Sequence, residues 1–129
     1  MEPISEDVRR FLQTQIASVE QLEVLRILAE DSQREFSDDE LRRLAQVSAE
    51  AIHPHLRTMN ERGLLRARSA DSRMYAQYGP HTTKLAEQIG QLLEVYRRHP
   101  VTMIRLVYKR STAALDDFAD AFRIRKKEP

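Results

Sequence analysis

The feature that most constrains this chain is a pair of helix caps, at Ser37 and Ser48, followed by a glycine at position 63. Ser37 and Glu40 form a capping box (Ser-x-x-Glu), which marks the first turn of a helix. Ser48 is placed to cap a second helix, and Gly63 is suited to end it in the left-handed conformation. The spacing therefore predicts a helix, a tight turn over residues 46–48, and a second helix.

The second helix of this pair has one apolar face and one polar face. Ile52, Leu56 and Met59 fall at i, i+4 and i+7, so they face the core. The opposite face is predicted to carry Glu50, His53, Arg57, Thr58 and Glu61.

Pro54 lies inside the same helix. If the helix starts at Ala49, the proline removes the hydrogen bond to the Glu50 carbonyl and crowds it, at a cost of about 3 kcal/mol in a helix interior. Either the helix kinks, or its first regular turn begins near His53. Both alternatives change how the end of this helix is presented to a partner.

A hairpin is predicted directly after Gly63. Residues 64–68 and 74–78 have the pattern of two strands, and residues 69–72 are turn formers. Phe36 is expected on a short strand that adds to this hairpin. A helix, a turn, a helix and a hairpin in this order are the elements of a winged helix-turn-helix, which predicts an α+β, mostly helical fold.

Two further helices are predicted before this unit. Ser5 is placed to cap a helix over residues 5–16, and Ser18 with Gln21 forms a second capping pair. The segment after Ser18 is the most regularly amphipathic part of the first third of the chain. Together with the hairpin these helices make a winged-helix domain over residues 1–80.

Residues 81–129 are predicted to be helical and to mediate dimerisation. Leu85, Ile89, Leu92 and Tyr96 form a seam on a helix over residues 82–98. Residues 101–108 are apolar on more than one side, which is typical of a buried helix. Ser111 is placed to cap a last helix, and residues 123–127 are a basic tail. We expect a homodimer that forms through residues 82–122.

Composition narrows the function. The chain has no cysteine and three glycines, which argues against thiolate metal sites and phosphate-cradling loops. No nucleophile arrangement is present, so no enzyme activity and no cofactor are predicted. No apolar run reaches the length of a membrane span, and the acidic N-terminus is unlike a signal peptide, so a cytoplasmic location is expected.

Charge is distributed unevenly along the chain, although the net charge is only +1. Residues 1–56 contain 6 basic and 12 acidic side chains, whereas residues 57–129 contain 15 basic and 8 acidic ones. A chain polarised in this way can present one basic face, or it can pair its two halves within one chain or across a dimer.

Residues 18–78, and above all the stretch SDDELRRLAQVSAEAIHPHLRTMNERGLL with the hairpin after it, resemble small bacterial winged-helix transcriptional regulators of the MarR/ArsR-like kind. The resemblance implies a homodimeric regulator that binds double-stranded DNA. Two features depart from the pattern, namely Pro54 and a recognition face with a single arginine. A winged-helix adaptor that binds a protein partner instead of DNA is the alternative.

The DNA-binding residues that follow from this interpretation lie on the second helix and beside the hairpin turn. Arg57 is placed to contact base edges in the major groove, and the hairpin arginines are placed to contact phosphates or the minor groove. A solvated helix face and ordinary cross-strand charge are the competing explanations. The predicted set is Ser48, His53, Arg57, Thr58, Arg66, Arg68 and Arg73.

The two histidines of the second helix are not predicted to bind metal. His53 and His55 form a His-x-His pair, but no further ligand stands at metal-binding spacing. His55 lies beside Ile52 and Leu56 and is expected to be packed and hydrogen-bonded. A ligand-sensing regulator would need a pocket between the winged-helix domain and the helix over residues 82–98, which no sequence pattern reveals.

Overall fold

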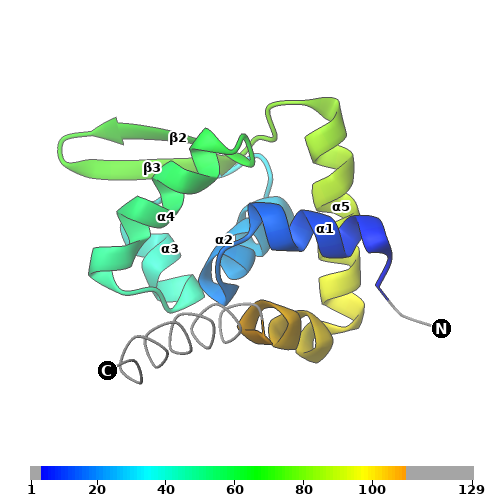
Figure 1. The fold of residues 1–129 in the computed structure, drawn as a ribbon. Helices are drawn as coiled ribbons and strands as arrows, with labels where there is room; N and C mark the ends of the chain where they lie inside the picture. Colours follow the sequence, from blue (N-terminus) through cyan, green and yellow to red (C-terminus); the bar gives the residue numbers. More distant parts are fainter. Residues whose placement is uncertain (1–3, 110–129) are drawn as a thin grey trace, which may run out of the picture.

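The computed structural model describes residues 4–109 of the chain, and Figure 1 shows an α+β, mostly helical winged helix. Residues 100–109 are also helical. The predicted last helix after Ser111 and the basic tail lie outside the described residues. The elements are α1 (Glu6–Gln15), α2 (Val19–Glu30), β1 (Glu35–Ser37), α3 (Asp38–Ala45), α4 (Ala49–Glu61), β2 (Leu65–Ala70), β3 (Arg73–Tyr78) and α5 (Thr83–Arg98).

Each of these helices starts at a hydroxyl side chain that accepts a hydrogen bond from the backbone three residues on. The distances are 3.1–3.2 Å. The capping box is complete, because Glu40 Oε1 accepts from the Ser37 backbone N–H at 3.1 Å. The caps are Ser5, Ser18, Ser37, Ser48 and Thr82. The helix starts predicted at the four serines are therefore confirmed.

The end of α4 is also as predicted. Gly63 has φ +78°, and its N–H donates to the Asn60 carbonyl at 3.0 Å. The Leu64 N–H donates to the Met59 carbonyl at 3.0 Å, which completes a Schellman motif. The helix begins at Ala49 and continues through Pro54, so the late start near His53 does not occur.

A three-stranded antiparallel sheet in the order β1-β3-β2 follows from the hairpin and the short strand at Phe36. Phe36 pairs with Ala76, and both are buried. The hairpin strands are longer than predicted. Their two-residue turn, Asp71-Ser72, has φ +52° and +66°, the left-handed pair of a type I′ turn.

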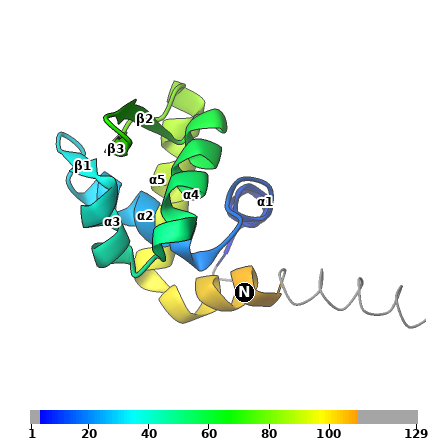
Figure 2. The ribbon, with the colours of Figure 1, turned by 90° about the vertical axis from the view of Figure 1, so that its left-hand side faces the viewer.

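The helices pack around α2. Four of its side chains, Leu22, Val24, Leu25 and Leu28, are fully buried. Seen after a 90° turn in Figure 2, α2 lies between α3 and α1, with α5 alongside. The helix over residues 100–109 contributes Met103 and Val107 to this core, and Ile104 and Leu106 are partly buried against it. The hairpin projects from the helical body in Figure 1, and we call residues 65–78 the wing.

Candidate nucleic-acid interface

The exposed side of α4, the predicted recognition helix, is weakly acidic. Ile52, Leu56 and Met59 are buried as predicted, with at most 3% of their surface exposed. The side chains turned to solvent carry two carboxylates and one guanidinium, which sum to a charge of −1. These exposed residues are Ala49, Glu50, Pro54, Arg57 and Glu61. This outer face of α4 therefore offers a single cation for base reading.

Arg57 is that cation. It is exposed, and it has no hydrogen bond or ion pair within residues 4–109. Thr58 is half-buried beside it, and its carbonyl accepts from the Arg62 N–H at 3.0 Å. Ser48 is exposed at the helix start, where its hydroxyl caps α4.

His53 lies on the flank of α4 rather than on its outer face. Its Nε2 is 2.6 Å from Asp38 Oδ2, and the same oxygen accepts from the Met74 N–H at 3.0 Å. Asp38 Oδ1 accepts from the Asp39 N–H at 2.6 Å. The Asp38 carboxylate thus joins α3, α4 and β3. His53 stays one turn from Arg57 on α4, but its half-buried ring is held by a tertiary partner on α3.

Hydrogen bonding controls the ionisation of Asp38. Burial alone raises the pKa of this carboxyl, but the bonds from His53, Met74 and Asp39 outweigh burial and hold the pKa below its ordinary value of 3.8. The carboxylate is therefore ionised at neutral pH.

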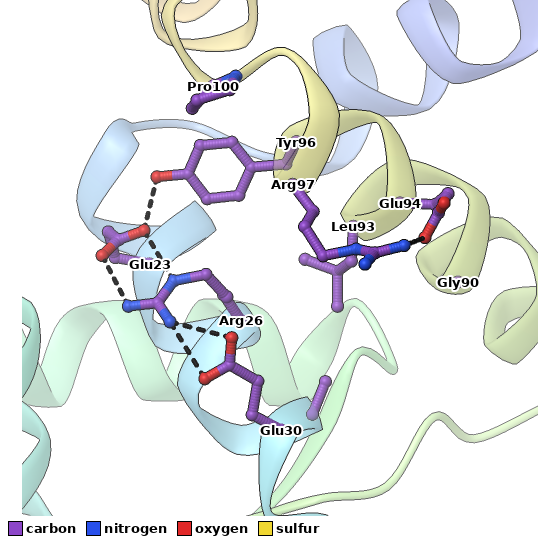
Figure 3. Close-up of a pocket in the computed structure, with 10 residues that line it drawn as sticks. Glu23, Arg26, Glu30, Gly90, Leu93, Glu94, Tyr96, Arg97 and Pro100 are labelled. Carbon is purple, nitrogen blue, oxygen red and sulfur yellow. Dashed lines mark hydrogen bonds and ion pairs between the residues drawn. The ribbon is translucent and has the colours of Figure 1, made fainter.

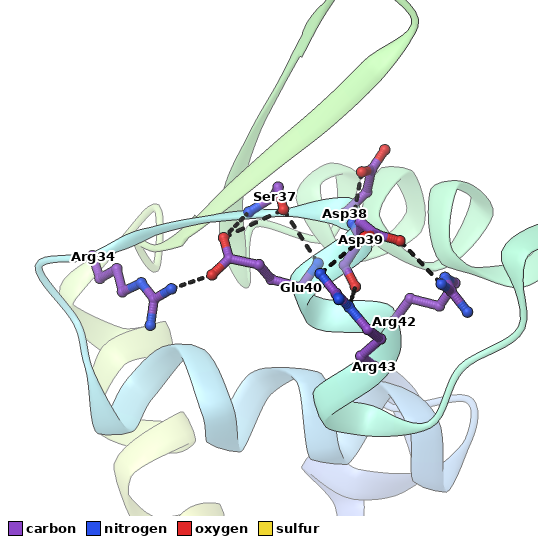
Figure 4. A network of polar contacts seen from close by, with 7 residues as sticks. All are labelled: Arg34, Ser37, Asp38, Asp39, Glu40, Arg42 and Arg43. Atoms are coloured by element: carbon purple, nitrogen blue, oxygen red, sulfur yellow. Dashed lines mark hydrogen bonds and ion pairs between the residues drawn. The ribbon is translucent and has the colours of Figure 1, made fainter.

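The arginines around the start of α3 are paired with neighbouring carboxylates, as Figure 4 shows. Arg42 and Arg43 each lie 3.0 Å from an oxygen of Asp39. Arg34 pairs with Glu40, the capping-box residue. These cations are consequently less available to a polyanion than Arg57.

The wing arginines lie on the face of the sheet turned away from the core. Their directly opposed partners are Gln77 for Arg66, Tyr75 for Arg68 and Ala70 for Arg73. Residues directly opposite each other in an antiparallel pair project from the same face. The core face of the same strands carries Leu65, Met74 and Ala76.

Arg68 is held in place on this face. It stacks over the Tyr75 ring at 4.3 Å, and its guanidinium donates to both oxygens of Glu35 at 2.7 and 2.8 Å. The bonds from Arg68 hold the pKa of the Glu35 carboxyl below its ordinary value. Arg68 therefore crosses the middle strand β3 and ties β2 to β1.

Arg66 and Arg73 have no hydrogen bond or ion pair within the part of the chain that the structure describes, and both are exposed. The aliphatic stem of Arg66 packs on Gly79, where a Cβ atom would lie 2.7 Å from Arg66 Cγ. Arg73 adjoins the turn. We call Arg57, Arg66 and Arg73 the free arginines, because their charges are not neutralised by described neighbours.

A separate cavity of about 450 Å³ lies between α2 and α5 and is shown in Figure 3. Arg26 binds Glu23 at 2.9 Å and Glu30 at 3.0 Å, and the Tyr96 hydroxyl donates to Glu23. Burial, with the bond to Glu23, raises the pKa of the Tyr96 hydroxyl. The sequence pattern placed Tyr96 on the apolar seam of the helix over residues 82–98 and could not reveal the cavity, because the cavity depends on how α2 and α5 pack.

Two other kinds of site are absent from residues 4–109. No three histidine or carboxylate side chains gather there as a metal site would require. No helix in this region has the length and apolar character needed to cross a bilayer.

The capped helix pair and the hairpin on a three-stranded sheet define the winged-helix class of proteins. No protein-family model and no curated protein sequence matches the chain. Solved structures, however, are similar to the chain in fold. Reduced HlyU from Vibrio cholerae N16961 is 22% identical, with a TM-score of 0.51, and the alignment covers 69% of this chain and 88% of that one.

Two further structures align over most of the chain. NadR in complex with 4-hydroxyphenylacetate is 20% identical, with a TM-score of 0.52, over 88% of this chain and 80% of its own. A point mutant of MepR from a multidrug-resistant S. aureus clinical isolate is 14% identical, with a TM-score of 0.53, over 91% of this chain and 87% of its own. All three are winged-helix transcriptional regulators of the MarR-like kind, so the predicted resemblance is confirmed in the fold.

Proposed function

We propose that this protein is a DNA-binding transcriptional regulator that acts in the cytoplasm as a winged-helix homodimer. The observation that carries the proposal is the pairing of an exposed recognition helix, which bears one free arginine, with a projecting wing that bears two. The similarity to regulators in fold supports it. Phosphate contacts position such a protein on DNA, and contacts to base edges supply specificity.

The free arginines divide this work. Arg57 on α4 is placed to bind a guanine edge in the major groove, the commonest specific arginine contact. Arg66 and Arg73 on the wing would bind phosphates or the minor groove. Ser48 and Thr58 complete the α4 contacts. His53 and Arg68 would join only if DNA displaced Asp38 and Glu35 from them.

We propose that residues 81–129 form a dimerisation region, with the interface in residues 82–122. Val101 and Tyr108, on the helix over residues 100–109, support this, because they are large apolar side chains with 61% and 62% of their surface exposed. In a two-fold dimer the two α4 helices would enter successive major grooves about one helical turn apart.

Titration of the full chain on genomic DNA fragments at two salt concentrations tests DNA binding. The expected result is binding that weakens steeply with salt, with a log–log slope of about −0.9 for each phosphate contact. Arg57→Ala should weaken binding to the preferred fragment about tenfold or more while leaving bulk DNA binding nearly unchanged. Arg10→Ala, the same charge change on α1, is the matched control. Salt-independent retention, or none at low salt, would contradict the proposal.

The acidic outer face of α4 favours a second candidate, a winged-helix adaptor that binds a protein. Glu50 and Glu61 repel phosphate, and Pro54 occupies the middle of this face. Replacing Arg66, Arg68 and Arg73 together with glutamate separates the candidates. Loss of DNA retention favours the regulator, whereas unchanged retention combined with loss of a co-purified partner favours the adaptor.

The cavity between α2 and α5 favours a ligand-responsive form of the regulator. It opens beside α5, which follows the wing and forms the first part of the proposed dimerisation region. NadR was solved with 4-hydroxyphenylacetate, so this compound is the first probe. A rise in the unfolding temperature that is absent in Gly90→Leu, a change that fills part of the lining, would support a ligand site here.

A further inference from the structure

A histidine holds the recognition helix α4 on each of its two flanks. On one flank His53 bonds to Asp38 at 2.6 Å. On the other, His55 Nδ1 lies 3.1 Å from Gln21 Nε2, and His55 Nε2 lies 3.0 Å from Glu20 Oε1. Both partners of His55 are on α2. The sequence does not distinguish the two histidines, but the structure gives them different partners. His53 bonds to a carboxylate, whereas His55 bonds to an amide and a carboxylate.

The orientation of the Gln21 amide fixes the protonation state of His55. The side-chain oxygen of Gln21 accepts from the Ala17 N–H at 3.0 Å, so this end of the amide is the acceptor. The other end is then the NH₂ group, which can only donate. His55 Nδ1 must therefore be unprotonated, and Nε2 carries the hydrogen that is donated to Glu20. The arrangement fits the neutral imidazole alone.

Protonation of His55 places two donors against each other. The new Nδ1–H faces the Gln21 NH₂ group, and only 2% of the Gln21 surface is exposed, so water has little access to it. Turning the Gln21 amide would satisfy His55 but would remove the acceptor from the Ala17 N–H. One buried hydrogen bond is lost in either case, and such losses destabilise a fold.

We propose that Gln21, His55 and Glu20 form a proton-sensitive latch that positions the recognition helix against α2, and that protonation of His55 opens it. Some charged groups around the His55 ring favour its protonated form, and others disfavour it. Glu20 attracts the imidazolium and holds the ring while the Gln21 bond breaks. The positive end of α2, whose first turn contains Glu20, disfavours a cation. Arg62, at the end of α4, donates to the Gln15 carbonyl at 2.8 Å and adds positive charge on the side of α4 that faces α1.

The other flank responds in the opposite sense. His53 faces the Asp38 carboxylate, with Asp39 nearby, and a protonated ring strengthens that bond. Acid therefore strengthens the attachment of α4 to α3 and β3, while on the α2 side it breaks the Gln21 bond and leaves Glu20 as the remaining partner of His55. The expected motion is a tilt of α4 about its His53 side. Its effect on DNA binding rests on the proposed function.

Hydrogen exchange of the α4 amides in the full chain at pH 7.5 and pH 5.5 tests the latch without DNA. After correction for the intrinsic exchange rate, we expect protection to fall about tenfold at pH 5.5, as for loss of one buried hydrogen bond. His55→Gln, whose side chain does not titrate, should show no fall in protection at pH 5.5. Gln21→Glu supplies an acceptor for Nδ1–H and should retain or raise protection at pH 5.5. His99→Gln, at the end of α5, is the control for loss of a histidine.

If protection of the α4 amides fell equally at pH 5.5 in the wild type and in His55→Gln, the proposal would be overturned. It would also be overturned if protection in the wild type did not fall at pH 5.5. If Gln21→Glu does not fold, His55→Gln decides alone. Retention of a nonspecific 25-base-pair duplex at the two pH values adds a separate measurement. Absence of retention at both pH values would count against DNA binding, whereas the exchange data would still decide the latch.

Discussion

The recognition helix and the wing present different charges to solvent. The outer face of α4 carries Arg57 between Glu50 and Glu61, with Pro54 at its centre. The outer face of the wing carries three arginines, and one of them is neutralised by Glu35. The wing is therefore suited to general attraction of a polyanion, whereas α4 can supply one specific contact. Under the proposed function, DNA affinity would come mainly from the wing, and specificity would depend on Arg57.

The two surfaces are joined at Asp38. This residue is at the start of α3, yet it bonds to His53 on α4 and to the Met74 N–H on β3. Its carboxylate therefore sets the position of the recognition helix relative to the wing. Changes at Asp38 should disturb both surfaces, whereas changes at the arginines should affect one of them.

Asp38→Ala is expected to have the largest effect. It leaves the Met74 N–H and His53 without their partner in a site that is 9% exposed, so the free energy of unfolding should fall by roughly 3 kcal/mol. Urea denaturation measures this change. Asp39→Ala, which removes only exposed ion pairs, is the control and should change stability by about 1 kcal/mol or less. An equal loss of stability in Asp38→Ala and Asp39→Ala would show that Asp38 does not link α3 to α4 and β3.

The lowered pKa of Asp38 also predicts how the stability of the fold depends on pH. Because its pKa is lower in the folded chain than the ordinary value of 3.8, the carboxylate stabilises the fold above that value. This contribution is lost as the pH falls below about 3.8 and through the folded-state pKa. Asp38→Asn should therefore be less stable at neutral pH but should lose less stability between pH 5 and pH 3. If the free energy of unfolding, measured by urea denaturation, changed with pH in the same way in the wild type and in Asp38→Asn, this assignment would be contradicted.

Arg66→Ala combined with Arg73→Ala tests the affinity assigned to the wing. Removing two phosphate contacts should flatten the log–log salt slope by about 1.8 and weaken binding to all sequences alike. Fluorescence anisotropy with a labelled duplex at several salt concentrations measures both quantities. Lys84→Ala with Arg10→Ala removes equal charge from α5 and α1. A loss confined to one DNA sequence would assign base reading to the wing instead.

The start of each capped helix could be predicted because a cap is local. Ser37 and Glu40 meet within one turn, and Gly63 ends α4 through bonds to the preceding turn. Phe36 was also placed correctly, as a lone aromatic before a cap. The Asp71-Ser72 turn was harder, because neither residue is the glycine that usually marks a type I′ turn.

The pairings in the site could not be predicted, because the partners are far apart in sequence. His53 bonds across 15 residues to Asp38, Arg68 across 33 to Glu35, and His55 across 34 and 35 to Gln21 and Glu20. Periodicity places a side chain on a helix face but does not show which element lies opposite. The sequence correctly predicted that His55 is packed and hydrogen-bonded, but its partners required the fold.

Glu35→Gln is the mildest change, and it distinguishes a free arginine from a paired one. The substitution removes the charge that holds Arg68 across Tyr75, so Arg68 becomes available to phosphate. If wing charge controls affinity, DNA binding should tighten and the salt slope should steepen by about 0.9, the value of one added contact. Glu30→Gln, an equal charge change on α2, should leave the slope unchanged. An unaltered slope in Glu35→Gln would mean that Arg68 does not reach the DNA, and that the wing acts through Arg66 and Arg73 alone.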